Sequence, residues 1–299
     1  MSENQIHGII GYTITPFDSQ DNVDTAAIEK STCRMIENGV HAIAPLGSTG
    51  EGAYLSETEW EQVAGTTIDC VDKRVPTIVS VSSLTTAQTI RNAKAAEKMG
   101  ATAVMVLPIS YWKLNEGEIL AHYRAVGEAV GIPIMLYNNP GTAGVDMPVD
   151  LIIRIVKEVA NVTMVKESTG DIQRMHQIHL RSNGEIPFYN GCNPMALEAF
   201  VAGATGWCTA APNLIPALNC ELYEATQAGE LERARKLFYR QLPLLDFILS
   251  GGLPTTIKAG LELQGIPVGT PRLPVAPLDD EGCLQLKKLL GQVTAKAAS

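Results

Sequence analysis

Short apolar segments alternate along the chain with longer stretches whose apolar residues recur at helical spacing. The segments are almost wholly apolar, which is typical of parallel strands buried on both faces. We predict strands at Gly8–Ile14, Ala42–Pro45, Thr77–Val81, Ala103–Leu107, Ile134–Tyr137, Val162–Val165, Pro187–Tyr189 and Gly206–Thr209. Between them we predict helices at Thr25–Asn38, Glu57–Val71, Thr86–Met99, Glu116–Val130, Val149–Val159, Ile172–Arg181, Met195–Ala202 and Ile215–Ala228.

Eight successive strand–helix units predict an α/β protein with a (β/α)₈, or TIM, barrel. An open doubly wound sheet is the alternative. It is less favoured because the units reach eight and no dinucleotide-binding glycine pattern follows the first strand. We assign residues 1–229 to the barrel and residues 230–299 to a C-terminal helical extension, with helices at Glu230–Leu249, Pro254–Gln264 and Asp279–Ala298.

Composition and charge exclude several classes of function. The 299 residues are 45% hydrophobic, so a large core is expected, and the net charge of −9 lacks a basic stripe. We therefore expect no nucleic-acid partner and no membrane partner, and no stretch approaches the roughly 20 apolar residues of a spanning helix. The six cysteines are scattered without a CxxC pair, which indicates reduced thiols and a cytoplasmic location.

Two residues with reactive side chains end predicted strands. In a barrel, catalytic groups lie at the carboxyl ends of the strands. Lys166 follows the sixth strand, where burial would favour the free amine that attacks carbonyl groups. Tyr137 ends the fifth strand and could move protons beside it. The alternatives are structural: the lysine extends to solvent beside Glu167, and the tyrosine caps the barrel core.

A glycine-rich loop follows the second strand, with the sequence Gly47-Ser-Thr-Gly-Glu-Gly52. Its backbone N–H groups and two hydroxyls suit a carboxylate or phosphate. It lacks the spacing of the common nucleotide-binding loops, so an ordinary tight turn is the alternative.

Together these residues resemble the dihydrodipicolinate synthase/N-acetylneuraminate lyase family of Schiff-base aldolases. The resemblance rests on Gly47–Glu51, on Tyr137-Asn-Asn-Pro140 followed by Gly144, and on Val165-Lys-Glu-Ser-Thr-Gly-Asp171. It implies a Schiff base on Lys166, proton relay by Tyr137 and carboxylate binding by Ser48 and Thr49, with Gly47 in the same loop. It also implies that Tyr111, in Pro108-Ile-Ser-Tyr-Trp112, reaches a neighbouring subunit's site in a homotetramer built as a dimer of dimers.

One substrate-binding position departs from the synthases that the chain resembles. Those enzymes carry an arginine two residues after the proline of the Tyr-Asn-x-Pro motif, and here that position is Thr142. Threonine cannot provide a paired cationic contact to a carboxylate. We therefore expect weak activity as a dihydrodipicolinate synthase.

Three functions remain open from the sequence. The first is a lyase that makes or breaks a carbon–carbon bond next to an enamine of pyruvate or a related small-molecule 2-oxo acid. The second is a dehydratase or deaminase that uses the same Schiff base on a 2-keto-3-deoxy acid or a cyclic imino acid. The third is a non-catalytic barrel that binds a metabolite. We expect no cofactor and no metal, since the imine itself accepts electrons and no ligand cluster is visible.

Overall fold

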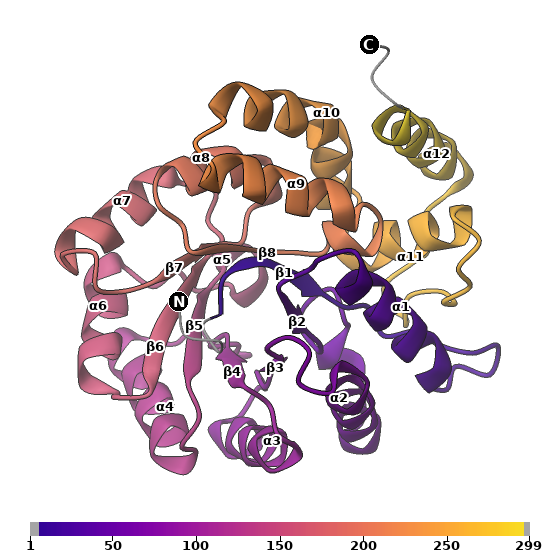
Figure 1. Ribbon diagram of the computed structural model, residues 1–299. Helices are drawn as coiled ribbons and strands as arrows, with labels where there is room; N and C mark the ends of the chain where they lie inside the picture. Colours follow the sequence, from indigo (N-terminus) through magenta and orange to yellow (C-terminus); the bar gives the residue numbers. More distant parts are fainter. Residues whose placement is uncertain (1–5, 296–299) are drawn as a thin grey trace.

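Eight parallel strands form the centre of the computed structural model, which describes residues 6–295 (Figure 1). They are β1 (Gly8–Tyr12), β2 (Ala42–Ala44), β3 (Ile78–Ser80), β4 (Ala103–Val106), β5 (Ile134–Asn138), β6 (Val162–Glu167), β7 (Phe188–Asn190) and β8 (Gly206–Thr209). Their spatial order is β2-β1-β8-β7-β6-β5-β4-β3. A parallel bridge between Ile43 and Thr77 joins β2 to β3, so the sheet closes on itself. The (β/α)₈ prediction is confirmed, and the open-sheet alternative is wrong.

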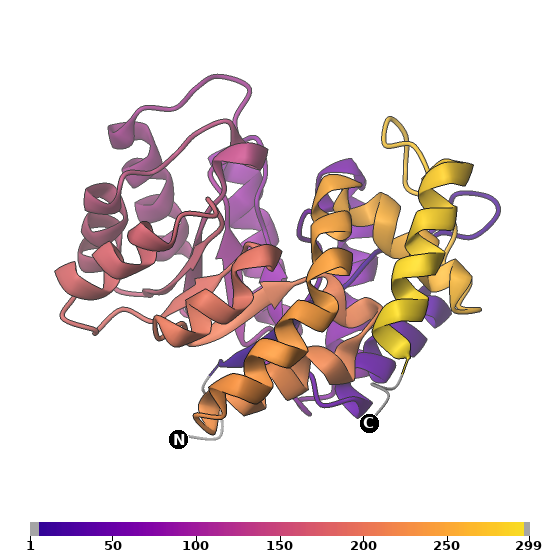
Figure 2. The ribbon, with the colours of Figure 1, turned by 90° about the horizontal axis from the view of Figure 1, so that it is seen from above.

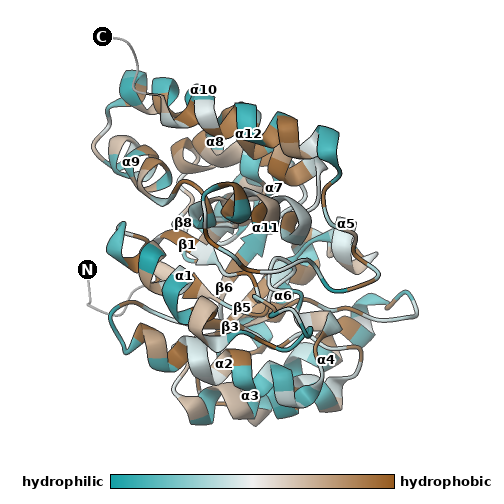
Figure 3. Cartoon of the chain, turned by 90° about the vertical axis from the view of Figure 1, so that its right-hand side faces the viewer, coloured by the Kyte–Doolittle hydropathy of each residue, from teal (hydrophilic) through white to brown (hydrophobic). Residues whose placement is uncertain are grey.

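Helices surround the barrel between successive strands. They are α1 (Thr25–Glu37), α2 (Glu57–Val71), α3 (Thr86–Met99), α4 (Glu116–Ala129), α6 (Val149–Glu158), α7 (Ile172–Arg181), α8 (Ala196–Val201) and α9 (Pro216–Gln227). Helix α2 begins with a capping box in which Ser56 and Glu59 satisfy each other's backbone N–H groups. Hydrophilic and hydrophobic positions alternate along the outer helices in Figure 3, as expected when one face packs on the strands.

The core has two layers on opposite sides of the sheet. Side chains that point outward from the strands pack beneath the helices in one large cluster. Side chains that point inward fill the barrel, among them Ile10, Met105 and Met135. Tyr12 and Tyr137 are the inward residues nearest the carboxyl ends of their strands. The polar residues at the carboxyl ends of the strands therefore lie directly next to the apolar interior of the barrel.

The C-terminal extension packs against one side of the barrel. Its helices are α10 (Leu231–Ser250), α11 (Leu253–Leu263) and α12 (Asp280–Thr294), and Figure 2 shows them grouped on one side of the strands. Helix α10 contacts α8 and α9 as well as α11 and α12. The helix expected at Asp279–Ala298 ends at Thr294, and its expected last residues lie outside the described part. A short helix, α5 (Pro140–Ala143), was not anticipated.

Candidate active site

Lys166 and Tyr137 lie side by side at the mouth of the barrel. They are register partners across β6 and β5, so both side chains point inward. Lys166 Nζ lies 3.7 Å from the centroid of the Tyr137 ring. The lysine is only 4% exposed, which contradicts the alternative of a side chain that extends to solvent. Glu167 points to the opposite side of the strand, and no carboxylate of residues 6–295 forms an ion pair with Lys166.

Tyr12 completes the surroundings of Lys166, although sequence reasoning did not select it. Its ring centroid lies 4.1 Å from Lys166 Nζ, so the amine sits between two phenol rings. The Tyr12 hydroxyl contacts Met105 Sδ at 2.9 Å. Burial, with smaller contributions from Cys208 and Tyr137, raises the pKa of Tyr12 well above its ordinary value. Its place as an aromatic residue at the end of β1 is the signal that could have identified it.

The loop Gly47–Gly52 brings two hydroxyl groups to the same mouth. Ser48 and Thr49 both line the cavity described below. The N–H groups of Gly50 and Gly52 donate to the Gly47 carbonyl at 3.0 and 3.4 Å, which leaves fewer free donors than the sequence suggested. Within residues 6–295, the N–H and hydroxyl groups of Ser48 and Thr49 have no protein partner. Both residues line the same cavity as Lys166, so these groups are available to a ligand there.

Gly47 has a steric role in this loop. A Cβ atom at this position would lie 3.0 Å from the Tyr12 ring. Glycine thus lets the loop approach the ring that flanks Lys166, which places Gly47 at the site through its backbone alone.

A cavity of about 490 Å³ opens above the lysine. Among the described residues that line it, Lys166 is the only charged one, and several others carry hydroxyl or amide groups: Ser168, Thr169, Asn193 and Thr209. The extension contributes part of the wall through the junction of α10 and α11, where Leu249, Leu253 and Pro254 supply apolar surface. The extension is therefore part of the site and more than an appendix to the barrel.

The short helix α5 and the residue before it, Asn139, form one side of the cavity. Asn139 donates from its side-chain amide to the Tyr137 hydroxyl at 2.7 Å, and its amide oxygen accepts the Thr142 N–H at 3.3 Å. Thr142 is exposed and lines the cavity. Asn139 was quoted within the Tyr137–Pro140 motif but was not selected as a site residue.

A polar network behind the strands fixes the two reactive residues from outside the barrel. The buried Glu167 carboxylate accepts hydrogen bonds from Asn138 Nδ2 at 3.1 Å and from the Thr169 N–H at 2.8 Å. Arg174 donates to Glu167 at 3.2 Å and pairs with Asp146 at 3.2 Å. Since Asn138 follows Tyr137 and Glu167 follows Lys166, this network holds both strand ends in register.

Two cysteines also line the cavity. Burial raises the pKa of the Cys208 thiol to about 11, although the positive charge of Lys166 opposes the change. Burial likewise raises the pKa of Cys192. Both thiols therefore stay protonated near neutral pH, which agrees with packing rather than nucleophilic attack.

Residues 6–295 contain no cluster of three or more His, Cys, Asp or Glu side chains that could hold a metal.

Tyr111 is separated from the cavity within this chain. It is 90% exposed in the loop that follows β4 and forms an edge-on contact with Trp112, itself 79% exposed. It does not line the cavity around Lys166 in this chain. None of the described helices is long and apolar enough to span a membrane.

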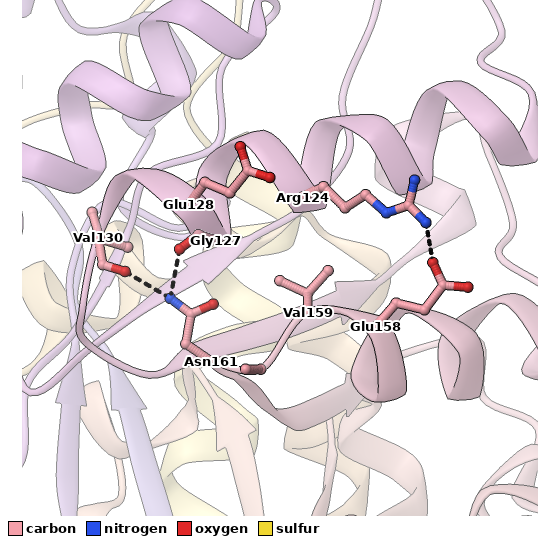
Figure 4. A pocket seen from close by; sticks show the side chains of 8 residues that line it. Arg124, Gly127, Glu128, Val130, Glu158, Val159 and Asn161 are labelled. Atoms are coloured by element: carbon pink, nitrogen blue, oxygen red, sulfur yellow. Dashed lines mark hydrogen bonds and ion pairs between the residues drawn. The ribbon is translucent and has the colours of Figure 1, made fainter.

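Another hollow lies at the opposite end of the barrel, between α4 and α6 (Figure 4). Arg124 pairs with Glu158 across it. Asn161 donates to the carbonyl oxygens of Val130 at 2.8 Å and Gly127 at 3.2 Å. These contacts satisfy the end of α4, so the hollow has a structural explanation.

The fold and the cavity define a (β/α)₈-barrel protein with a buried lysine at its catalytic face. The model of the dihydrodipicolinate synthetase family matches residues 5–293. A 4-hydroxy-tetrahydrodipicolinate synthase from Methanoculleus marisnigri is 33% identical over 286 residues, covering 95% of this chain and 98% of the relative. The chain therefore belongs to the dihydrodipicolinate synthetase family and is a lyase, which excludes the non-catalytic alternative.

Solved structures agree with this assignment. A Pseudomonas aeruginosa protein, described provisionally as a dihydrodipicolinate synthetase, is 69% identical with a TM-score of 0.95, covering 97% of this chain and 99% of its own. A dihydrodipicolinate synthase from Acinetobacter baumannii, complexed with pyruvate, is 31% identical with a TM-score of 0.93, covering 97% and 99%.

Proposed function

We propose that the protein makes or breaks a carbon–carbon bond through a Schiff base between Lys166 and pyruvate or a related 2-oxo acid. The observation that carries this proposal is the placement of Lys166 Nζ between two phenol rings, as the only charged group that lines the cavity among the described residues. The pyruvate complex of the Acinetobacter baumannii synthase supports the choice of substrate.

The chemistry follows from the groups around the amine. The Lys166 amine adds to the keto carbon, and loss of water from the carbinolamine gives a protonated imine. The protonated imine withdraws electrons from the neighbouring carbon. That carbon can therefore lose a proton, or one of its carbon–carbon bonds can break, and either step gives an enamine. In the reverse direction, the enamine carbon attacks an aldehyde and forms the new carbon–carbon bond.

Tyr137 is the proton carrier in this proposal. Its hydroxyl accepts the amide hydrogen of Asn139 at 2.7 Å, which orients the phenol and leaves its own proton free to donate. Ser48 and Thr49 line the cavity and would bind the substrate carboxylate through their hydroxyl and N–H donors. The imine itself is the electron acceptor, so these steps need no further cofactor.

A dehydratase or deaminase reaction is the second candidate. It uses the same imine but expels water or ammonia from the substrate. The hydroxyl and amide groups that line the cavity favour this reaction, because they can bind a hydroxylated substrate. At the position of Thr142, a hydroxyl stands where the synthases carry an arginine.

We further propose that the protein assembles as a homotetramer in which Tyr111 enters the site of a neighbouring subunit. The exposure of Tyr111 and Trp112 at the catalytic face supports an interface there.

A borohydride experiment tests the function. Incubation with pyruvate followed by borohydride should inactivate the enzyme permanently, whereas either reagent alone should not. Product analysis on a panel of 2-keto-3-deoxy acids and hydroxyproline-derived imino acids then separates bond cleavage from loss of water or ammonia. Turnover without any inactivation by pyruvate and borohydride would contradict the imine.

A further inference from the structure

A buried ion pair with the C-terminal extension holds the loop that carries Ser48 and Thr49. Glu51, in the same loop, has a fully buried side chain, and its Oε1 lies 2.6 Å from Lys258 Nζ on α11. Its Oε2 accepts the Arg272 backbone N–H at 2.6 Å. Both partners belong to the C-terminal extension. Glu51 also adopts a left-handed backbone conformation, with φ of 55°, which nonglycine residues rarely adopt without outside support.

The extension side of this contact is itself rigid. Lys258 is 1% exposed, donates to the Thr270 carbonyl at 3.0 Å and lies 4.1 Å from the centroid of the Phe17 ring. The Arg272 guanidinium covers the same ring at 4.2 Å and pairs with Glu59 at 2.8 Å. Burial lowers the pKa of Lys258, while the Glu51 carboxylate opposes that change.

We infer that Lys258 and Arg272 are positioning residues that hold Glu51 so that Ser48 and Thr49 face the substrate carboxylate. Glu51 is two residues from Thr49, and the carbonyl of the intervening Gly50 accepts the Thr15 hydroxyl at 2.6 Å. The loop is thereby fixed on both sides. This inference rests on the proposed function, since it assigns the extension a part in binding the 2-oxo acid.

The test compares how much pyruvate half-saturates borohydride trapping in wild type and variants. Lys258→Met leaves Glu51 as an unpaired buried carboxylate, and we expect the half-saturating concentration to rise about tenfold. Glu51→Gln should act in the same direction. The double variant Glu51→Gln/Lys258→Met removes both charges and should return to within about threefold of wild type.

Lys236→Met is the matched control. Lys236 lies in the same extension and pairs with Glu232, but both side chains are highly exposed. We expect no change in half-saturation from this variant. If Lys258→Met lowers only the melting temperature and leaves half-saturation unchanged in folded protein, the inference is wrong.

Hydrogen exchange separates this inference from the proposed function. Wild type that traps no pyruvate would overturn the imine but not the fastening of the loop. Peptides that cover Gly47–Gly52 should exchange faster in Lys258→Met and in Glu51→Gln than in wild type and Lys236→Met. Unchanged exchange in both variants would contradict the inference, even if a variant has lost activity. Where one single variant does not fold, the other and the double variant carry the comparison.

A pair of thiols outside the active site supports a second, independent proposal. Cys33 on α1 and Cys70 on α2 have their sulfur atoms 3.3 Å apart, and both residues are partly exposed. Arg74 Nη2 lies 3.2 Å from Cys33 Sγ. The same guanidinium donates to the carbonyl oxygens of Cys70 at 2.6 Å and Val71 at 3.2 Å, so its position is fixed.

We propose that Cys33 and Cys70 form a disulfide when the protein meets a hydroperoxide. Cys33, whose sulfur lies beside the Arg74 guanidinium, reacts as a thiolate: it attacks the peroxide oxygen and releases hydroxide or an alkoxide. The Cys70 thiol then attacks the resulting sulfenic acid, and water leaves. Overall, two thiols are oxidised by one hydroperoxide, giving a disulfide, water and a second water or an alcohol. Burial, and then Cys33, raises the pKa of Cys70 to about 12, so Cys70 stays protonated near neutral pH and is not the thiol that meets the peroxide first.

Hydrogen peroxide followed by alkylation and peptide mapping tests the pair. We expect a peptide that links Cys33 to Cys70 and loss of alkylation at both, while Cys283 remains alkylated. Arg74→Gln should slow formation of the link about tenfold, because the charge beside Cys33 is gone. The proposal is wrong if Cys33 and Cys70 remain as alkylated as in untreated protein.

Discussion

Gly191 lies directly against the Lys166 side chain. A Cβ atom there would lie 2.8 Å from Lys166 Cε and 1.7 Å from Ser168 Oγ. We expect Gly191→Ala to displace the amine and lower kcat by about ten- to a hundredfold, since small misplacements of a reacting group are costly. Steady-state kinetics would check this.

Gly65→Ala is the control for that substitution. Gly65 lies within α2, and an added Cβ would meet nothing within 4 Å. It should leave kcat unchanged and raise stability by about 0.5–1 kcal/mol. Equal kcat values for Gly191→Ala and wild type would show that the close approach of Gly191 does not position the lysine.

Thr142 lines the cavity at the position proposed to select the second substrate. We expect wild type to condense pyruvate with aspartate semialdehyde poorly, because Lys166 is the only charged residue that lines the described cavity and it is occupied by the imine. Thr142→Arg should raise kcat/KM for the semialdehyde by about ten- to a hundredfold through a charge-assisted hydrogen bond. Thr142→Gln, which adds length without charge, should raise it much less. Efficient condensation by wild type would refute this account of specificity.

At the scale of elements, hydrophobic patterning predicted every strand because buried parallel strands are continuous apolar runs. The strand ends were less well defined: β6 continues through Lys166 and Glu167, since both are buried despite their charge. Helix α5 was missed because four residues carry no helical periodicity. Lys166, Tyr137 and the Gly47 loop could be found from strand ends and motifs.

Other parts of the site depend on long-range packing that no local pattern records. Tyr12 reaches Lys166 only because β1 and β6 close into the same barrel. The contribution of Leu249 and Leu253 to the cavity likewise depends on how the extension folds back over the barrel.

His41, at the start of β2, gives this element a pH-dependent stability. Its Nδ1 accepts the Ile9 N–H at 3.1 Å, which requires a neutral ring. Burial, with a smaller effect of His7, lowers the pKa of His41 from 6.5 to about 4. Between these values the unfolded chain binds a proton that the folded protein does not, so stability falls as pH drops from 6.5 towards 4.

The variant His41→Asn keeps an acceptor for the Ile9 N–H but removes the titration. Between pH 7 and pH 5, wild type should lose about 1 kcal/mol more unfolding free energy than the variant, a value reduced because the ring is partly exposed. Urea unfolding at the two pH values measures the difference. Equal losses in both proteins would contradict this role of His41.

At the scale of the whole molecule, the proposed sharing of sites between subunits predicts complementation. Lys166→Ala and Tyr111→Ala should each be nearly inactive alone. When the two are unfolded and refolded together, hybrid dimers contain one site with both residues intact, so about a quarter of wild-type activity should return. Activity no higher than that of the separate variants would show that Tyr111 acts within its own chain or not at all.

The central claim is that Lys166 carries the covalent intermediate, and mapping the reduced pyruvate adduct by mass spectrometry tests it most directly. Wild type should carry the adduct on Lys166. Lys166→Ala, which lacks the amine, and Lys166→Arg, whose guanidinium stays protonated, should carry none and should not turn over. Lys258 is the informative internal comparison, since it is a second buried lysine but is paired with Glu51. The account predicts an adduct on Lys166 alone; an adduct on Lys258, or none with any 2-oxo acid, would contradict it.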